Sequence, residues 1–261
     1  MAALTASGIA FDDCGGGDPA LLFLPGWCGP RTVFAPLADR LEGSFRTLAV
    51  DWRGHGESNE SEGDFGSADL VDDAVAVIDQ SGAGRVVPVA LAHAGWVAIE
   101  LRRRLGPERV PRLVLVDWMV LGAPPPFLEA LAAMANPQTT RAVVDQITAM
   151  WVAGLDLPVL NDYVASMAAF PDEMWARAAR AITASFEQFG APLEAIAALD
   201  PPPPTLHLYA QPPDPTYLEA QRAVAADHPW FEVERLNAAS HFPTIEVPEA
   251  IAGHLDKFVV R

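Results

Sequence analysis

The sequence predicts an α/β fold in which a central, mostly parallel sheet is covered by helices on both faces and carries a helical insertion. Three observations lead to this prediction. Apolar runs of strand length recur along the first half of the chain, segments with helical spacing separate them, and a later stretch has helical spacing but no strand. Continuous apolar strands that alternate with helices are typical of parallel sheets buried on both faces.

The first half of the chain supplies four expected strands and three expected helices. The first strand ends in Pro-Gly, the second breaks into a Gly-rich loop, and Gly82 stops the second helix, since these residues interrupt regular structure. We expect strands at 20–27, in the first part of 45–58, at 85–91 and at 112–118, and helices at 31–41, 68–82 and 93–106.

The pattern changes between residues 122 and 198, where helical pieces joined by Pro and Gly follow one another. The sheet resumes with a strand in 200–211, after a stiff Pro run. A last strand at 230–237 and a closing helix at 248–259 complete the chain. We therefore expect one α/β core, residues 1–121 and 199–261, with a helical cap inserted at 122–198. A length of 261 residues suits this organisation.

The stretch VALAHAGW, residues 89–96, ends the third strand and opens a helix. Its spacing is that of a nucleophile elbow, the sharp turn that lifts a serine into the active site of an α/β-hydrolase fold. The strand order, the helical insertion and a histidine after the last strand favour the same fold. The nucleophile position, however, is occupied by Ala92, so a methyl group stands where a hydrolase needs a hydroxyl.

His241 lies between the last strand and the last helix, where this fold carries its catalytic histidine. Two aspartates are candidates for its acid partner. Asp117 ends the strand after the elbow, where a buried carboxylate needs a partner. Asp214 follows the strand that most often carries the acid, but it lies among prolines, where a turn role is sufficient. We favour Asp117 and keep Asp214 as the alternative, because either would fix the tautomer of His241 and stabilise its charged form.

Hydrolysis through an acyl-enzyme is not expected without the serine, since its loss typically costs on the order of 10⁶ in rate. We expect the side chain of His93 to point away from the site while its backbone N–H faces the pocket. Together with the N–H of Trp27 it would form an oxyanion hole. A base beside an anion-binding site can deprotonate an acidic hydroxyl or carbon and hold the resulting oxyanion.

The pocket is expected to be apolar and aromatic. Trp27 follows the first strand on the loop that faces the elbow, Leu91 immediately precedes Ala92, and Trp151 lies in a helix of the insertion. Packing alone would account for most of the seven tryptophans of one domain, so position supports these assignments more than residue type does. Further candidates for the lining are Met119, Phe127 and Met150.

The composition and motifs of the chain limit the classes of molecule that it is expected to bind. A net charge of −17 disfavours binding to nucleic acid or to an anionic membrane. The histidines lack metal-binding spacing and no G-x-G-x-x-G turn follows the first strand, so neither a metal nor a dinucleotide cofactor is expected. Two cysteines, no signal-peptide pattern and no apolar run long enough to span a membrane favour a cytoplasmic protein. We expect a monomer or a homodimer.

Seven short motifs resemble the cofactor-independent ring-cleaving dioxygenases of 3-hydroxy-4(1H)-quinolones, which have an α/β-hydrolase fold. The order and spacing of these motifs carry the resemblance, which extends over nearly the whole chain. They read LPGWC, DWRGHGES, HAGWV, PERVPRLVLVDW, AQPPDPTY, DHPWF and SHFPTIEVP.

The resemblance implies a base formed by His241 and Asp117, with substrate contacts from Trp27 and Trp151 and no cofactor. The implied partners are a small aromatic substrate and O₂. His241 would remove the proton of the 3-hydroxyl group, after which the substrate anion would react directly with O₂. The heterocyclic ring of a 2-alkyl-3-hydroxy-4(1H)-quinolone would open with loss of carbon monoxide and leave an N-acylanthranilate.

Departures from the family pattern bear on the substrate. The elbow serine of this family is not a covalent nucleophile, so the resemblance makes Ala92 compatible with the chemistry. Ala92, Leu91 and Gly29 stand where the family often has polar residues near the substrate. These replacements predict a more apolar site, suited to a long 2-alkyl chain.

Other classes of function compete with this reading. An α/β-hydrolase inactivated by the exchange of its elbow serine for Ala92 would regain ester hydrolysis when a serine is introduced. A non-enzymatic binder of a small apolar ligand would not need the pair of His241 and Asp117. A lyase on the same fold usually needs the serine that this chain lacks.

Overall fold

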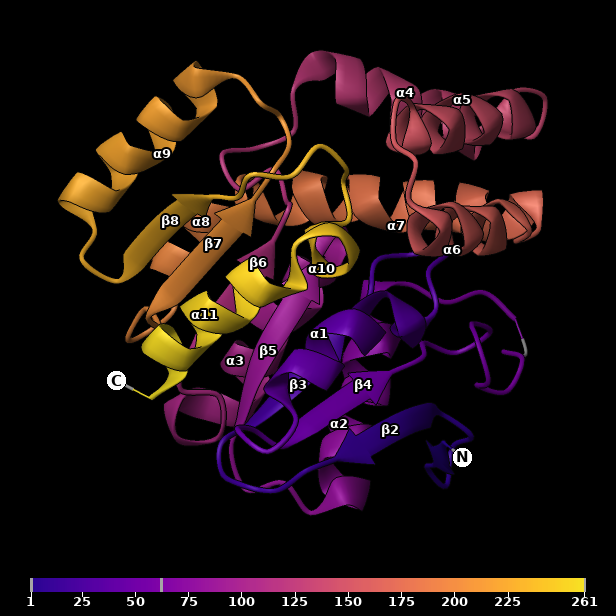
Figure 1. The fold of residues 1–261 in the computed structure, drawn as a ribbon. Coiled ribbons are helices and arrows are strands. Elements are labelled where there is room, and N and C mark those ends of the chain that lie inside the picture. The colour runs from indigo at the N-terminus through magenta and orange to yellow at the C-terminus, as the bar shows by residue number, and fades with distance from the viewer. Residues whose placement is uncertain (1, 62, 261) are drawn as a thin grey trace.

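The computed structural model describes residues 2–61 and 63–260. Its centre is an eight-stranded sheet with the strand order β1-β2-β4-β3-β5-β6-β7-β8 (Figure 1). Only the pairs β1–β2 and β2–β4 are antiparallel, so the predicted α/β fold with a mostly parallel sheet is confirmed. The strands are β1 (Ala3–Leu4), β2 (Ala10–Cys14), β3 (Ala20–Leu24), β4 (Thr47–Val50), β5 (Val86–Leu91), β6 (Leu113–Val116), β7 (Thr205–Tyr209) and β8 (Phe231–Arg235).

The five central strands are buried along their whole length and mostly apolar, because both faces of the sheet are covered. Every residue of β3, β4, β5, β6 and β7 is buried. Figure 1 shows helices in front of the sheet and behind it. Those in front are α1 (Ala35–Leu41) and α11 (Pro248–Val259), and those behind are α2 (Ser67–Ser81) and α3 (Gly95–Arg109).

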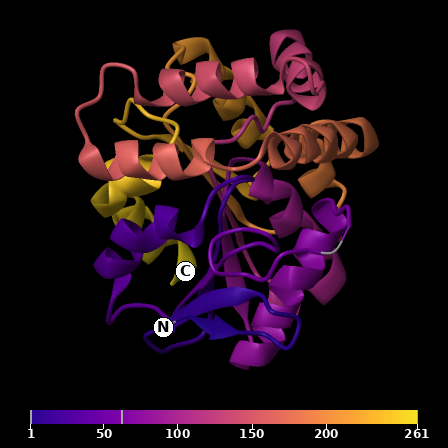
Figure 2. The same cartoon turned by 90° about the vertical axis from the view of Figure 1, so that its right-hand side faces the viewer.

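Five helices connect β6 to β7, within the segment expected to form the cap. The first four, called the helical layer below, stand over the end of the sheet at which the parallel strands finish (Figures 1 and 2). Proline in the first turn starts the first, third and fifth of these helices, where its missing N–H is not needed. They are α4 (Pro125–Ala135), α5 (Thr140–Val152), α6 (Pro158–Ala168), α7 (Asp172–Phe189) and, packed beside α3, α8 (Pro192–Ala197).

The structure departs from the expected elements in several places. The segment expected as one helix at 31–41 divides into a 3₁₀ turn, η1 (Arg31–Phe34), and α1. The helix expected from residue 93 begins only at Gly95, since a 3₁₀ turn, η2 (Ala92–Ala94), precedes it. Four elements were not anticipated: β1, β2, α9 (Pro215–Asp227) and α10 (Pro243–Glu246).

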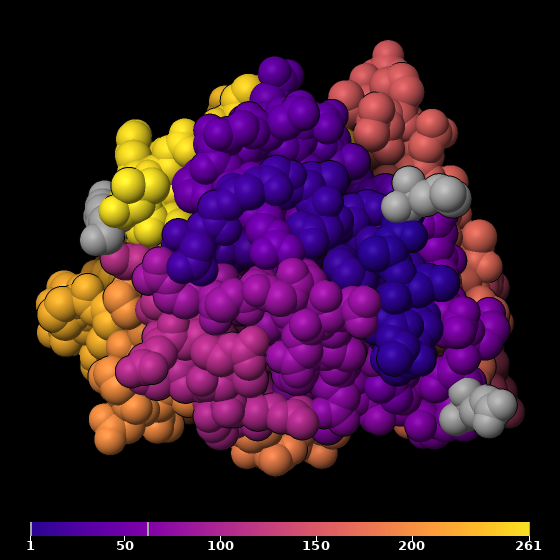
Figure 3. Space-filling view, turned by 90° about the horizontal axis from the view of Figure 1, so that it is seen from below, coloured from indigo at the N-terminus to yellow at the C-terminus, as the bar shows by residue number. Residues whose placement is uncertain are grey.

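The end of the molecule opposite to the helical layer carries the starts of the parallel strands. Figure 3 shows this end, where segments of the N-terminal half form most of the visible surface. In residues 2–61 and 63–260, no helix is long and apolar enough to cross a membrane.

Candidate active site

The turn after β5 has the backbone geometry of a nucleophile elbow. Ala92 follows the last residue of β5 with a φ of 50°, in the left-handed region that residues other than glycine rarely adopt. The chain then passes through η2 into α3. The Ala92 side chain borders a cavity at this point, so the elbow presents a methyl group to the site.

Asp117 and His241 meet beside the elbow. Asp117 follows β6, also in the left-handed region with a φ of 49°. Its Oδ1 accepts hydrogen bonds from the backbone N–H groups of Ala210, at 2.6 Å, and Gln211, at 2.8 Å. Its Oδ2 lies 2.6 Å from Nδ1 of His241. Both oxygens of the buried carboxylate therefore have hydrogen-bond partners. The contact through Nδ1 leaves Nε2 of His241 free to bind a ligand in the cavity.

The alternative acid, Asp214, lies elsewhere and has another role. Its Oδ1 accepts a hydrogen bond from the backbone N–H of Thr216 at 2.9 Å, which caps the start of α9. This bond lowers the pKa of the exposed Asp214 carboxyl. The structure thus brings Asp117, and not Asp214, to His241.

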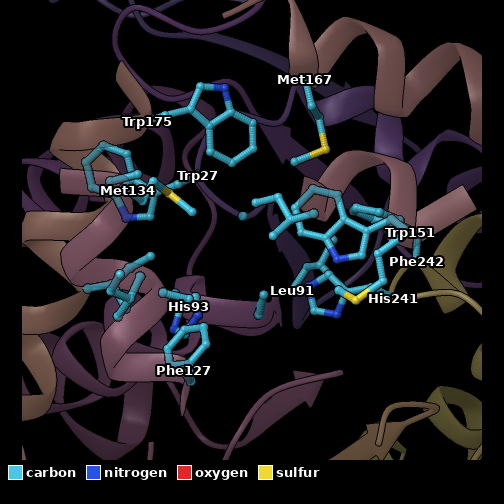
Figure 4. Close-up of a pocket in the computed structure, with 18 of the residues that line it drawn as sticks. Trp27, Leu91, His93, Phe127, Met134, Trp151, Met167, Trp175, His241 and Phe242 are labelled. Carbon is cyan, nitrogen blue, oxygen red and sulfur yellow. The ribbon is translucent and has the colours of Figure 1, made fainter. Parts of the chain in front are cut away.

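A cavity of about 300 Å³ lies between the strand ends and the helical layer. Figure 4 shows His241 and Trp151 on one side of it and His93 across from them. Most lining side chains are apolar, as the sequence predicted, and they include the expected Trp27, Leu91, Met119, Phe127 and Met150. The lining from the helical layer comprises Ala130, Leu131, Met134, Ile147, Met150, Trp151, Tyr163, Met167, Trp175, Ala178 and Ile182, with Phe127 at the start of α4.

Two tryptophans flank the reactive groups. The Trp151 indole stacks on the His241 imidazole, with ring centroids 5.5 Å apart and planes 18° apart. Trp27 lies on the loop after β3, where its indole stacks on Phe65 at 5.6 Å. The stacking on Trp151 holds the orientation of the His241 ring, and the stacking on Phe65 holds Trp27 in the cavity wall.

His93 does not point away from the site, as the sequence had led us to expect. Its imidazole lines the cavity and stacks on Phe127 at 5.4 Å. The expectation was wrong because η2 turns the chain before α3 begins, so His93 is not the first residue of an α-helix. Its Nδ1 accepts a hydrogen bond from the indole N–H of Trp118 at 3.1 Å. Burial, and then the nearby His241, lower the pKa of His93 to about 3, so this imidazole is neutral.

The backbone N–H groups of Trp27 and His93 frame the elbow. Neither donates a hydrogen bond to another residue in the described part of the chain. The two loops come close together, since a Cβ placed on Gly26 would lie 3.9 Å from the Cβ of Ala92. Free N–H groups on two neighbouring strand-end loops are the donors that an oxyanion hole requires.

Sequence reasoning missed several lining residues of the helical layer. Tyr163 of α6 and Trp175 of α7 both line the cavity, and the Tyr163 hydroxyl and the Trp175 indole N–H are buried without a hydrogen-bond partner among the described residues. Helical spacing marks both as buried, but it cannot tell a side chain that faces a cavity from one that faces another helix.

Residues 2–61 and 63–260 contain no group of three or more His, Cys, Asp or Glu side chains placed to hold a metal ion. His55, in the loop DWRGHGES, accepts a hydrogen bond from the backbone N–H of Cys28 at 3.0 Å. It therefore supports the loop that carries Trp27.

The chain is similar to several known proteins. A model of the "Alpha/beta hydrolase family" matches residues 21–254. The chain is 34% identical to the 2-heptyl-3-hydroxy-4-quinolone dioxygenase AqdC1 of Rhodococcus erythropolis, over 91% of this chain and 85% of that protein. It is also 34% identical to the 1H-3-hydroxy-4-oxoquinoline 2,4-dioxygenase of Pseudomonas putida, over 99% of both chains.

Solved structures give the same result. One describes an AqdC variant in complex with its substrate, in work on recognition and ring cleavage of the Pseudomonas quinolone signal. It superposes on this chain with a TM-score of 0.93 at 31% identity, covering 100% of this chain and 98% of that one.

Proposed function

This chain belongs to the alpha/beta hydrolase family and, within it, to the 3-hydroxy-4-quinolone 2,4-dioxygenases; from this premise we propose that its substrate is a 2-alkyl-3-hydroxy-4(1H)-quinolone. The enzyme is a ring-cleaving oxygenase. Its products are carbon monoxide and an N-acylanthranilate, and it works without a cofactor.

The observation that carries the proposal is the pair of Asp117 and His241 at the cavity wall. The 2.6 Å contact between Asp117 Oδ2 and His241 Nδ1 requires a proton on Nδ1, since a carboxylate can only accept. The Nε2 lone pair is then free to take the proton of the 3-hydroxyl group. Asp117 stabilises the imidazolium that forms, and the N–H groups of Ala210 and Gln211 hold that carboxylate in position.

The deprotonated substrate reacts with O₂ directly. A bond forms between one oxygen atom and C2, and the distal oxygen of the resulting peroxide attacks the C4 carbonyl. Collapse of the bicyclic intermediate breaks the C2–C3, C3–C4 and O–O bonds. C3 leaves with its own oxygen as carbon monoxide, while C2 becomes the amide carbonyl and C4 the carboxylate of the N-acylanthranilate. The proton stays on His241 and passes to solvent or product.

This scheme explains why the elbow persists without a nucleophile. The substrate anion attacks O₂ itself, so no step needs a hydroxyl at residue 92. The turn still presents the N–H of His93 opposite the N–H of Trp27, and both can stabilise negative charge that develops on the C4 oxygen. Ala92 is therefore tolerated in a dioxygenase of this kind and would disable an esterase.

The long 2-alkyl chain is supported by the cavity rather than by the relatives. One relative is named for a 2-heptyl quinolone and the other for a quinoline without an alkyl group, and both are 34% identical to this chain. We assign residues 122–198 as a substrate-binding cap, because its apolar side chains provide most of the cavity lining. Each buried methylene contributes about 0.8 kcal/mol, close to fourfold in affinity.

The decisive experiment is anaerobic mixing followed by admission of O₂. With 2-heptyl-3-hydroxy-4(1H)-quinolone and no O₂, we expect the absorbance of the substrate to shift to that of its anion. Added O₂ should then produce carbon monoxide and N-octanoylanthranilate in equal amounts. His241→Ala is the control and should show no shift. The proposal fails if the wild-type protein shows neither the anion nor carbon monoxide, or if 2-methyl and 2-heptyl substrates react equally well.

We further place this enzyme in the cytoplasm, as a monomer or a homodimer. Both cysteines, Cys14 and Cys28, are free thiols, and Cys14 is exposed. An exposed thiol without a partner suits a reducing compartment. Fractionation and size-exclusion chromatography would test the two assignments separately.

A further inference from the structure

Building on the proposed function, we propose that Trp118 is a positioning residue: its indole N–H holds the His93 imidazole in the tautomer that offers an Nε2–H donor to the substrate. Trp118 directly follows Asp117 at the end of β6 and is 2% exposed. It does not line the main cavity, so it acts through His93.

The hydrogen bond between the two side chains determines where the proton of His93 resides. An indole nitrogen can only donate, because it has no lone pair available as an acceptor. At 3.1 Å the Trp118 Nε1–H therefore requires a lone pair on Nδ1 of His93. A neutral imidazole carries one proton, and that proton must then be on Nε2.

The imidazole of His93 lines the cavity in which a ligand would lie. Nε2 of His93 has no hydrogen-bond partner among the described residues, yet it is not fully buried and keeps some accessible surface. A ligand in the cavity would therefore contact the ring that carries Nε2–H. The low pKa of His93, about 3, keeps the ring neutral even after His241 has taken a proton. The site thus contains a proton acceptor on one histidine and a neutral donor on the other.

Trp118 is itself held in place by contacts of its backbone and of its ring. Its backbone N–H donates to Nε2 of His207 at 3.3 Å, and its carbonyl accepts from the hydroxyl of Tyr217 at 3.0 Å. Nδ1 of His207 pairs with Oε1 of Gln221 at 2.5 Å, which fixes the tautomer of His207 in turn. A Cβ on Gly95 would lie 2.2 Å from the Trp118 ring, so only glycine allows α3 to approach the indole this closely.

The chemical consequence concerns the oxygen on which negative charge develops. If Nδ1 carried the proton, the Nε2 lone pair would face the substrate anion and repel it. With the proton on Nε2, His93 adds a side-chain donor to the backbone N–H groups of Trp27 and His93. Removal of a single donor of this kind from an oxyanion hole lowers kcat by about 10²–10³-fold.

The test compares Trp118→Phe with Trp96→Phe. The two indoles pack edge to face at 5.0 Å in the same cluster, and the indole N–H of Trp96 is buried without a partner among the described residues. Both variants lose the same bulk, but only Trp118→Phe loses a hydrogen bond to His93. We expect Trp118→Phe to lower kcat by about 10-fold or more with a smaller change in KM, and Trp96→Phe to retain most of kcat.

A readout that does not depend on turnover is the ¹⁵N NMR spectrum of the histidine rings, with the His93 signal assigned by its loss in His93→Leu. The wild-type protein and Trp96→Phe should show His93 as the Nε2–H tautomer, and Trp118→Phe should show a mixture. A proton on Nδ1 in the wild-type protein, an unchanged tautomer in Trp118→Phe, or equal losses of kcat in both variants would overturn the proposal.

Two further results distinguish a failure of this proposal from a variant that does not fold and from a failure of the proposed function. If Trp118→Phe does not fold, the wild-type spectrum still decides the tautomer, and His93→Gln should recover activity that His93→Leu lacks, since an amide N–H can replace the Nε2 donor. If wild-type protein cleaves no 3-hydroxy-4-quinolone, the proposed function fails, whereas the spectra still decide whether Trp118 sets the tautomer.

Discussion

The two sides of the cavity are built in different ways. On the strand-end side, three non-glycine residues have left-handed backbone conformations, and in the described part of the chain they are the only ones: Cys28, Ala92 and Asp117. Ala92 and Asp117 directly follow the buried parallel strands β5 and β6, and Cys28 lies in the loop after β3. Backbone N–H groups hold the Asp117 carboxylate there, and that carboxylate holds His241.

The helical-layer side is instead made mostly of apolar side chains, including flexible methionines, which can adopt other packing arrangements more easily. Met134, Met167 and Ile147 are typical of it, and its two buried polar groups at the cavity, on Tyr163 and Trp175, have no hydrogen-bond partner among the described residues. We infer that the two sides of the cavity have different functions. The strand ends fix the atoms that carry out the chemistry, and the helical layer selects the substrate. Substitutions on the first side should lower kcat, and those on the second side should change KM and chain-length preference.

The largest effect is expected for the base itself. His241→Ala should lower kcat by about 10³–10⁴-fold, since a positioned general base typically contributes 10²–10⁴. Asp117→Asn should lower kcat by about 10²–10³-fold, because the neutral amide no longer stabilises the imidazolium. Stopped-flow absorbance of the substrate anion, measured without O₂, would separate deprotonation from the oxygen step. A variant that still forms the anion at the wild-type rate would contradict the role of the pair.

A smaller effect is expected from filling the cavity from the helical layer. Ala130 lines the cavity, whereas Ala132, two residues further along α4, is exposed. Ala130→Leu should lower kcat/KM for the 2-heptyl substrate by about 10-fold and leave the 2-methyl substrate nearly unchanged, since overpacking costs about 1–3 kcal/mol. Ala132→Leu is the matched control and should change neither. Equal losses with both substrates would mean that this wall does not bind the chain.

A still smaller effect tests the contact between the two sides. The Arg177 guanidinium of α7 lies 4.4 Å from the ring centroid of Phe65, which stacks on Trp27. Arg177→Met should raise KM about two- to fivefold at constant kcat, because a cation over an aromatic ring contributes about 0.5–1 kcal/mol. Arg112→Met removes a similar contact, to Phe258 at 5.2 Å, away from the cavity lining and should leave KM unchanged. A loss of kcat in Arg177→Met would show that the contact supports the chemistry instead.

The same difference explains which parts of the site were predictable. Ala92, Asp117 and His241 each stand next to a recognisable apolar strand or closing helix, so their positions follow from strand order. The lining of the helical layer does not follow, because helical spacing defines a buried face without saying whether a neighbouring helix or a cavity covers it. The orientation of His93 depends on the left-handed φ of one preceding residue, and no periodicity reports a single backbone angle.

The fold was predictable for a similar reason. Mostly apolar runs located the strands β3 to β7, and the expected last strand corresponds to β8, with ends that differ by a few residues. The strand β1 was missed because it has only two residues, and β2 was missed because it carries Asp12 and Asp13, which are unfavourable in strands. Pairing with β4 supplies a tertiary contact that the local sequence does not encode.

The smallest expected effect concerns the elbow. If the strand ends need only an anion-binding turn at residue 92, Ala92→Ser should change ring cleavage by less than about threefold, well under 1 kcal/mol. An inactivated hydrolase would behave otherwise, since restoring a serine beside an intact histidine and acid should raise ester hydrolysis by orders of magnitude. Assays of p-nitrophenyl acetate and of the quinolone on the same preparation compare the two directly. Strong new esterase activity would place the chemistry of this site with the hydrolases, while unchanged quinolone cleavage would show that the turn is kept for its N–H groups.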